Sequence, residues 1–186
     1  MKKTVKKLLA LIIAVLLCLS FTACKNRTEN VSNEEAPACS EQTIRELMEK
    51  NLDCYFLFYI SPIPHTTQQN SDGYFGTQEG YFESYEELKN FVFATYTDEK
   101  ATALLEYPEK DAPVYKDSQG LIFVDPTLVP KTEYPVSWEE YDIDMNTTDT
   151  SCTFTLTTTD FDGNEYTAEG KAVLEDNEWR LADLVY

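Results

Sequence analysis

The chain has a single histidine, His65, among its 186 residues. Serine-histidine triads, HExxH zinc sites and cysteine-histidine dyads all need a histidine in a fixed relation to a second group, and His65 has no such partner motif around it. Hydrolytic catalysis of these kinds is therefore not expected. His65 is predicted to be a loop residue, and no metal or cofactor site is predicted.

Basic side chains are also scarce, because 15 lysines and arginines stand against 33 aspartates and glutamates. Proteins bind nucleic acids through lysines and arginines that neutralise phosphates, so nucleic acid is excluded as a partner. An anionic lipid surface would repel such a domain as well. Two interpretations of the acidity stay open: electrostatic recognition of a cationic partner or cleft, and a solvated extracytoplasmic surface.

The one long apolar run, residues 8–19, is shorter than the roughly 20 residues of a membrane-spanning helix. Four lysines precede it, and the small residues Thr22 and Ala23 lead to Cys24, so the segment 1–23 is predicted to be a signal peptide. The run before Cys24 resembles the lipobox of bacterial lipoproteins, in which the cysteine is acylated. The expected location is the outer face of the cytoplasmic membrane, and a secreted form cut near Ala23 is the alternative.

Removing residues 1–23 leaves 11 basic and 33 acidic side chains, a formal charge of −22. Residues 24–39 have almost no large apolar side chains and are predicted to be a flexible tether. Residues 40–186 are enough for one domain with a single core, and they contain no internal repeat.

Three cysteines remain after export and acylation: Cys39, Cys54 and Cys152. Cys39 and Cys54 flank a predicted helix whose rise of about 1.5 Å per residue separates them by some 22 Å, so they are not expected to pair. A bridge between Cys54 and Cys152 stays open beside the preferred interpretation, which is buried free thiols.

Helical periodicity comes first along the domain. Ser40 is a predicted N-cap, and an apolar face follows it at positions 44, 47, 48, 51, 52 and 55. The aromatic run 55–60 is compatible with a continuing helix or a buried strand, and Pro62 ends it in either case. Its aromatic side chains are expected to fill the core or to line the mouth of a pocket.

Further elements are predicted after a polar loop that reaches Gly73. A capping box at Ser84 and Glu87 starts one helix, and Thr97 caps a second that Pro108 breaks. A hairpin over 113–124 and strands over 136–145, 150–159, 165–174 and 178–185 follow. This order predicts an α+β fold, with N-terminal helices packed on a curved antiparallel sheet as in cystatin-like and NTF2-like domains.

The strand region contains several clusters of acidic residues. The segment 142–153 begins with the Asp-x-Asp-x-Asn spacing of a calcium-binding loop. Thr147 and Thr153, however, stand where such a loop needs glycine and glutamate. The segment 160–164 is predicted to be a hairpin tip whose carboxylates project toward a partner. Adjacent acids such as Glu86 and Glu87 are predicted to be solvated surface, not an acid/base pair.

Three segments carry a family resemblance: 80–89, 95–105 and 114–124, which read GYFESYEELK, TYTDEKATALL and VYKDSQGLIFV. They resemble the IseA-type DL-endopeptidase inhibitor family, and the likeness is looser over the rest of 42–186. The resemblance implies an extracytoplasmic acidic protein that plugs NlpC/P60-type enzymes, which cut the stem peptide of peptidoglycan in the cell wall. Such an inhibitor needs carboxylates and shape but no nucleophile or metal.

The leading hypothesis is therefore a lipid-anchored, non-enzymatic inhibitor whose partner is a cell-wall endopeptidase with a basic cleft. Its candidate contact residues, chosen for exposure, lie on one hairpin and the strand beside it: Asp160, Asp162, Glu165, Asp142 and Asp144. The alternative function is a cystatin-like or NTF2-like lipoprotein that binds a small ligand in an aromatic pocket.

Overall fold

Helix α2 (Glu41–Tyr55) is the first element of the structure, a computed structural model that describes residues 37–107 and 112–186. The predicted signal peptide, the acylated Cys24 and the tether as far as residue 36 lie outside the described residues. Ser40 caps α2 as predicted: its hydroxyl accepts the backbone N–H of Thr43, and the Thr43 hydroxyl accepts the N–H of Ser40. The predicted apolar face is confirmed, with Cys54 buried on it as well.

The aromatic run continues the helix as a π-helical turn, η1 (Phe56–Ile60), so the helix is the correct one of the two alternatives. The turn ends where the N–H of Ser61 bonds to the carbonyl of Phe56. Leu57 and Phe58 are buried, and the centroids of the Phe58 and Tyr115 rings lie 5.1 Å apart in an edge-to-face arrangement. Part of the run, Tyr55, Leu57 and Phe58, is therefore in the core, whereas Phe56 is exposed.

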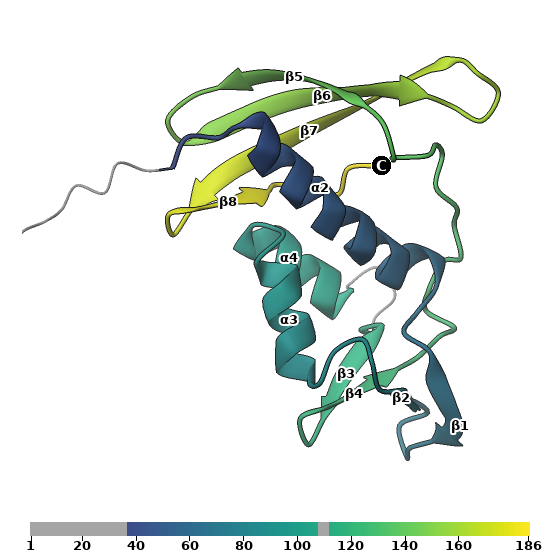
Figure 1. Cartoon of the computed structure of the whole chain (residues 1–186). Coiled ribbons are helices and arrows are strands. Elements are labelled where there is room, and N and C mark those ends of the chain that lie inside the picture. The colour runs from purple at the N-terminus through teal and green to yellow at the C-terminus, as the bar shows by residue number, and fades with distance from the viewer. Residues whose placement is uncertain (1–36, 108–111) are drawn as a thin grey trace, which may run out of the picture. The chain divides into compact units, whose positions relative to one another are not determined.

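Four strands form the larger sheet: β5 (Asp142–Thr147), β6 (Ser151–Thr159), β7 (Glu165–Glu175) and β8 (Glu178–Leu181). They are an antiparallel meander in the order β5-β6-β7-β8, as predicted. Cys152, Phe154 and Leu156 alternate with threonines on β6 and are buried, because this face packs on the core. Helix α2 runs along that face (Figure 1).

A second sheet, in the order β1-β2-β4-β3, departs from the single curved sheet of the prediction. Its strands are β1 (His65–Gln69), β2 (Phe75–Thr77), β3 (Tyr115–Ser118) and β4 (Leu121–Val124). The hairpin of β3 and β4 is confirmed, but the predicted polar loop, which reaches Gly73, contains β1, and β2 follows directly after it. Strand β1 is exposed along most of its length, so it has no alternation of apolar residues to reveal it.

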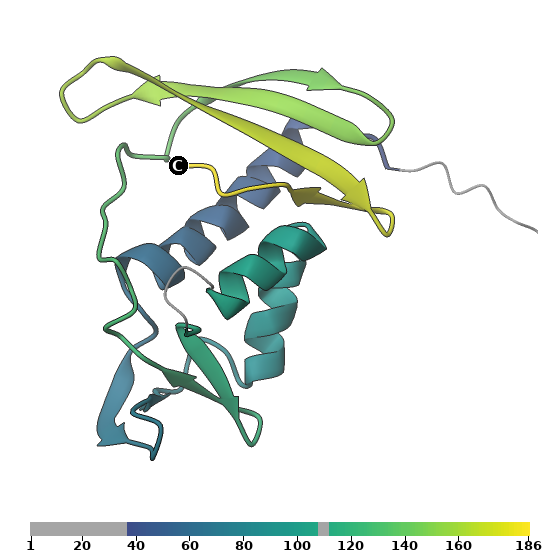
Figure 2. The same ribbon diagram turned by 180° about the vertical axis from the view of Figure 1, so that it is seen from behind.

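Helices α3 (Tyr85–Phe93) and α4 (Asp98–Glu106) lie between the two sheets (Figure 2). The N-cap Ser84 is confirmed, because its hydroxyl accepts the N–H of Glu87. The carboxylate of Glu87 accepts the N–H of Glu83 and not that of Ser84, so the predicted capping box is wrong in this half. Thr97 precedes α4 without a side-chain cap bond, and Pro108 lies outside the described residues.

The packed unit starts before the predicted boundary at Ser40. The indole N–H of Trp179 donates to the carbonyl of Pro37 at 2.6 Å, and Cys39 is buried in the core. Residues 37–39, the last residues of the predicted tether, therefore belong to the fold.

Asn51 connects distant parts of this unit through one buried side-chain amide. Its Nδ2 donates to the carbonyl of Val185 at 2.6 Å. Its Oδ1 accepts the N–H of Val185 at 3.1 Å and the hydroxyl of Tyr96 at 2.9 Å. These bonds join helix α2 to the C-terminal segment and to the connection between α3 and α4. Within the described ranges, no helix has the length and apolarity needed to cross a membrane.

Candidate functional site

The solvent-facing side of the larger sheet carries the candidate acids. Because successive residues of a strand point to opposite faces, Asp142 and Asp144 on β5 lie opposite the buried face, as do Glu165 and Glu169 on β7. Thr155 on β6 pairs in register with Asp144 on one side and Glu169 on the other. We call this surface the outer face; its residues are Asp142, Asp144, Asn146, Thr153, Thr155, Thr157, Glu165, Thr167, Glu169 and Lys171.

Three of the five predicted contact residues, Asp142, Asp144 and Glu165, share this outer face. All three side chains are exposed. No ion pair of the described residues includes them, because those pairs belong to α2, α3, α4 and the region around β8. Their negative potential is therefore directed to solvent and to an approaching partner.

The other two predicted residues lie in the turn between β6 and β7, residues 160–164, which we call the hairpin tip. The N–H of Asp160 donates to the carbonyl of Asn164 at 2.8 Å, and the N–H of Gly163 donates to the carbonyl of Asp160 at 3.1 Å. Gly163 has a φ of 84°, a left-handed conformation that glycine adopts without strain. The prediction that this segment is a hairpin tip is confirmed.

Asp160 has a structural task in the tip. Its carboxylate accepts the backbone N–H groups of Asp162 at 2.9 Å and Asn164 at 2.8 Å, and the side-chain amide of Asn164 at 3.1 Å. These bonds, those from Asn164 first, lower the pKa of the Asp160 carboxyl. The Asp160 carboxylate is thus committed to holding the loop, whereas the carboxylates of Asp162 and Glu165 are exposed.

Phe161 is the residue of the tip that the sequence prediction missed. Its side chain is 74% exposed, the highest value among the large hydrophobic residues of the described ranges. The signal was present in the sequence: a large aromatic stands between two aspartates of a turn, where the backbone geometry needs only small or polar residues. An exposed aromatic on a rigid turn is typical of a binding anchor.

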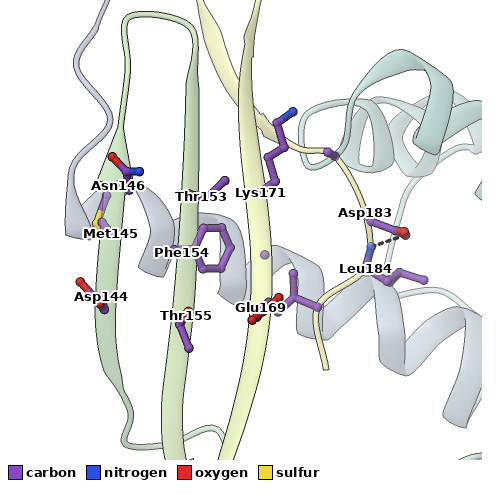
Figure 3. A pocket seen from close by; sticks show the side chains of 13 residues that line it. Asp144, Met145, Asn146, Thr153, Phe154, Thr155, Glu169, Lys171, Asp183 and Leu184 are labelled. Carbon is purple, nitrogen blue, oxygen red and sulfur yellow. Dashed lines mark hydrogen bonds between the residues drawn. The ribbon is translucent and has the colours of Figure 1, made fainter.

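A hollow of about 590 Å³ lies at the larger sheet beside the C-terminal segment and is lined by residues of both faces of β5, β6 and β7. Figure 3 shows Asp144, Thr155, Glu169 and Lys171 among the side chains that line it, together with the ring of Phe154. The Phe154 ring packs over Gly170 on the buried face of the sheet, where a Cβ on Gly170 would stand 2.2 Å from the ring. The aromatic run 55–60 does not line this hollow, so the hollow is not the predicted aromatic pocket.

His65 lies apart from these surfaces. It is in strand β1 and not in a loop, and its ring stands 4.7 Å from that of Phe75. The segment 142–153, which was compared with a calcium loop, forms β5, the turn after it and the start of β6, so it is an extended hairpin and not a calcium-binding loop. Across residues 37–107 and 112–186, no three side chains of His, Cys, Asp or Glu are grouped closely enough to hold a metal ion.

Comparison with known proteins adds no assignment. No protein-family model matches the chain, and no curated protein matches it.

Proposed function

We propose that the protein is a lipid-anchored inhibitor of an NlpC/P60-type peptidoglycan DL-endopeptidase, held at the outer face of the cytoplasmic membrane by Cys24. It binds the enzyme through the hairpin tip and the adjoining outer face and performs no bond cleavage itself. The proposal combines the resemblance of segments 80–124 to the IseA-type family with the surface described above.

The observation that carries the proposal is the exposed Phe161 on a preorganised turn with the free carboxylates of Asp162 and Glu165 beside it. The hydrogen bonds of Asp160 fix the loop before any partner arrives, so binding orders few additional groups. A rigid aromatic that enters a cleft gives affinity by burial, and the carboxylates next to it favour a basic cleft. The tip is the only part of the described surface that combines these features with the predicted acids.

The outer face extends the same charge along the sheet. Asp142 and Asp144 on β5 are separated from Glu165 and Glu169 on β7 only by the threonines of β6. The negative surface therefore continues along the sheet for several residues behind the tip. A cationic rim around the enzyme's active site would meet this surface while Phe161 occupies the cleft. Long-range attraction of this kind raises the association rate and decreases with ionic strength.

The direct test is binding and inhibition measured on the same preparation. The immobilised protein is exposed to secreted NlpC/P60 enzymes at 50, 150 and 500 mM salt (roughly spanning Debye lengths of 14 to 4 Å), and bound enzymes are identified. The same enzymes are then assayed on muropeptides with and without the protein. The proposal predicts capture that weakens with salt and a block of hydrolysis. Enzyme that neither binds nor loses activity would contradict it, and an apolar molecule that co-purifies with the protein would favour the small-ligand alternative.

A further inference from the structure

Strand β5 forms one edge of the larger sheet. It pairs with β6 over six residues in an unbroken register, and no described strand pairs with its other side (Figure 1). The opposite edge of the sheet is covered, because the N–H of Thr97 donates to the carbonyl of Leu181 on β8 at 2.9 Å. The edge strands of the smaller sheet, β1 and β3, have only five and four residues. Strand β5 is therefore the longest open edge that the structure describes.

The hydrogen bonds around β5 show which of its backbone groups point to this open side. In the turn after β5, the N–H of Thr148 donates to the carbonyl of Ser151 at 2.8 Å. Bonded pairs alternate along an antiparallel ladder, so the even-numbered residues of β5 direct their backbone groups to β6 and the odd-numbered residues direct theirs away. Tyr141, just before the strand, agrees with this pattern, because its carbonyl accepts a bond from Arg45 on α2 at 3.3 Å and not from β6.

The open side thus presents the N–H and C=O groups of Ile143 and Met145. Within residues 37–107 and 112–186, no side-chain or loop hydrogen bond reaches the backbone of either residue. Their side chains are half-buried and pack against the core, which holds the strand in place. The strand has no proline, lysine or bulge, the features that commonly keep an edge from pairing. These backbone groups are therefore available to an added strand.

We propose that β5 binds an extended peptide segment of a partner protein in which basic and apolar residues alternate. The charge of the strand selects the basic residues: Asp142 and Asp144 are exposed on the outer face and belong to no ion pair of the described residues. Lysines or arginines of the added strand lie beside these carboxylates, and its apolar side chains lie beside Ile143 and Met145 on the other face.

A second copy of the chain is a poorer occupant of the same edge. If β5 paired with β5 of another copy, Asp142 and Asp144 of both copies would share one continuous face, and like charges side by side destabilise a sheet. The inference goes beyond the proposed function, which uses the side chains of these aspartates but not the backbone of β5. The peptide segment can belong to any partner, so the test needs no endopeptidase.

The test is the binding of a synthetic peptide to the full chain in a neutral detergent, measured by isothermal titration calorimetry. The peptide has about seven residues, alternates lysine and valine, and is acetylated and amidated at its ends. Met145→Pro removes an N–H that points away from β6 and leaves the β5–β6 bonds in place, so it should weaken binding roughly 30-fold or more. Met145→Ala keeps this N–H and is the matched control, with an affinity within about threefold of the wild type.

Amide hydrogen exchange of the wild type tests the same edge without a substitution. At saturation, the peptide should slow exchange at the N–H groups of Ile143 and Met145 by roughly tenfold or more and leave the amides of β1 unchanged. A peptide with glutamate in place of each lysine should not bind, because its charges repel Asp142 and Asp144. Circular dichroism shows whether Met145→Pro retains the fold.

Failure of the wild type to bind the lysine peptide would overturn the proposal, as would equal affinity of the wild type and a folded Met145→Pro variant. Slowed exchange confined to other parts of the protein would also overturn it, and this measurement decides alone if Met145→Pro does not fold. A dimer of the free wild type that Met145→Pro abolishes would assign the edge to a second copy and not to a partner peptide.

Discussion

At the scale of single residues, the buried side chain of Asn51 joins parts of the fold that are distant in sequence. It makes hydrogen bonds to both backbone groups of Val185 and to the hydroxyl of Tyr96. Replacing it leaves three buried polar groups without a partner, and each such group costs about 1–3 kcal/mol. We predict that Asn51→Ala lowers the free energy of unfolding by about 3 kcal/mol or more, measured by urea denaturation. Asn90→Ala, on the exposed side of α3, is the control and should change it by less than about 0.5 kcal/mol. Equal effects of the two variants would contradict this role.

Asp160 gives a prediction that depends on pH. Because the folded state lowers the pKa of its carboxyl, the stabilisation from its bonds is present above the unfolded pKa and is lost as the pH falls through the folded pKa. We predict that the Asp160 carboxyl titrates below its ordinary value of 3.8 in an NMR pH series, and that the amide signals of Asp162 and Asn164 shift with the same midpoint. A midpoint at or above the ordinary value would show that these bonds do not form in solution.

The sequence predicted the acids of the site but not the difference between them. Asp160 and Asp162 are the same residue type two positions apart, and only the turn geometry shows that one carboxylate is used inside the loop and the other is free. Phe161 was missed because an aromatic residue is ordinarily assigned to a core.

At the scale of elements, the β6–β7 hairpin depends on the contact between Phe154 and Gly170. A methyl group at position 170 would stand 2.2 Å from the Phe154 ring, so the ring or the strand must move. We predict that Gly170→Ala lowers the free energy of unfolding by about 1–3 kcal/mol, as overpacked cores do. The control is Thr167→Ala, which removes a side chain on the outer face of β7, the strand that contains Gly170. An unchanged stability of Gly170→Ala would show that the hairpin adjusts without cost.

Elements with a strong pattern were predictable. Helix α2 and strand β6 each bury one face, so their apolar residues recur with the period of a helix and of a strand. The sequence pattern therefore predicts both elements. Strand β1 buries almost nothing, and its position depends on pairing with β2. The π-helical turn of η1 depends on tertiary packing against Tyr115, so a run of apolar residues could not distinguish it from a strand.

At the scale of the whole molecule, the excess of carboxylates over basic groups is the property that the proposed function uses. We predict that Asp162→Lys combined with Glu165→Lys slows association with the endopeptidase by about tenfold at low salt and has a smaller effect at high salt. Asp149→Lys makes the same type of charge change in the turn between β5 and β6, at the opposite end of the sheet, and should change the rate much less. Surface plasmon resonance at two salt concentrations measures both. If the two ends of the sheet give equal effects, net charge and not the hairpin tip is responsible.

The most direct measurement is the inhibition constant of the protein against an NlpC/P60 endopeptidase on a muropeptide substrate, determined for the wild type, Phe161→Ala and Leu121→Ala. Leu121 is a comparably exposed apolar residue on another hairpin, so it controls for loss of apolar surface. The account predicts that the wild type and Leu121→Ala inhibit alike, while Phe161→Ala is weaker by about 10- to 100-fold. Cleavage of the substrate by the protein alone, or equal inhibition by all three proteins, would contradict it.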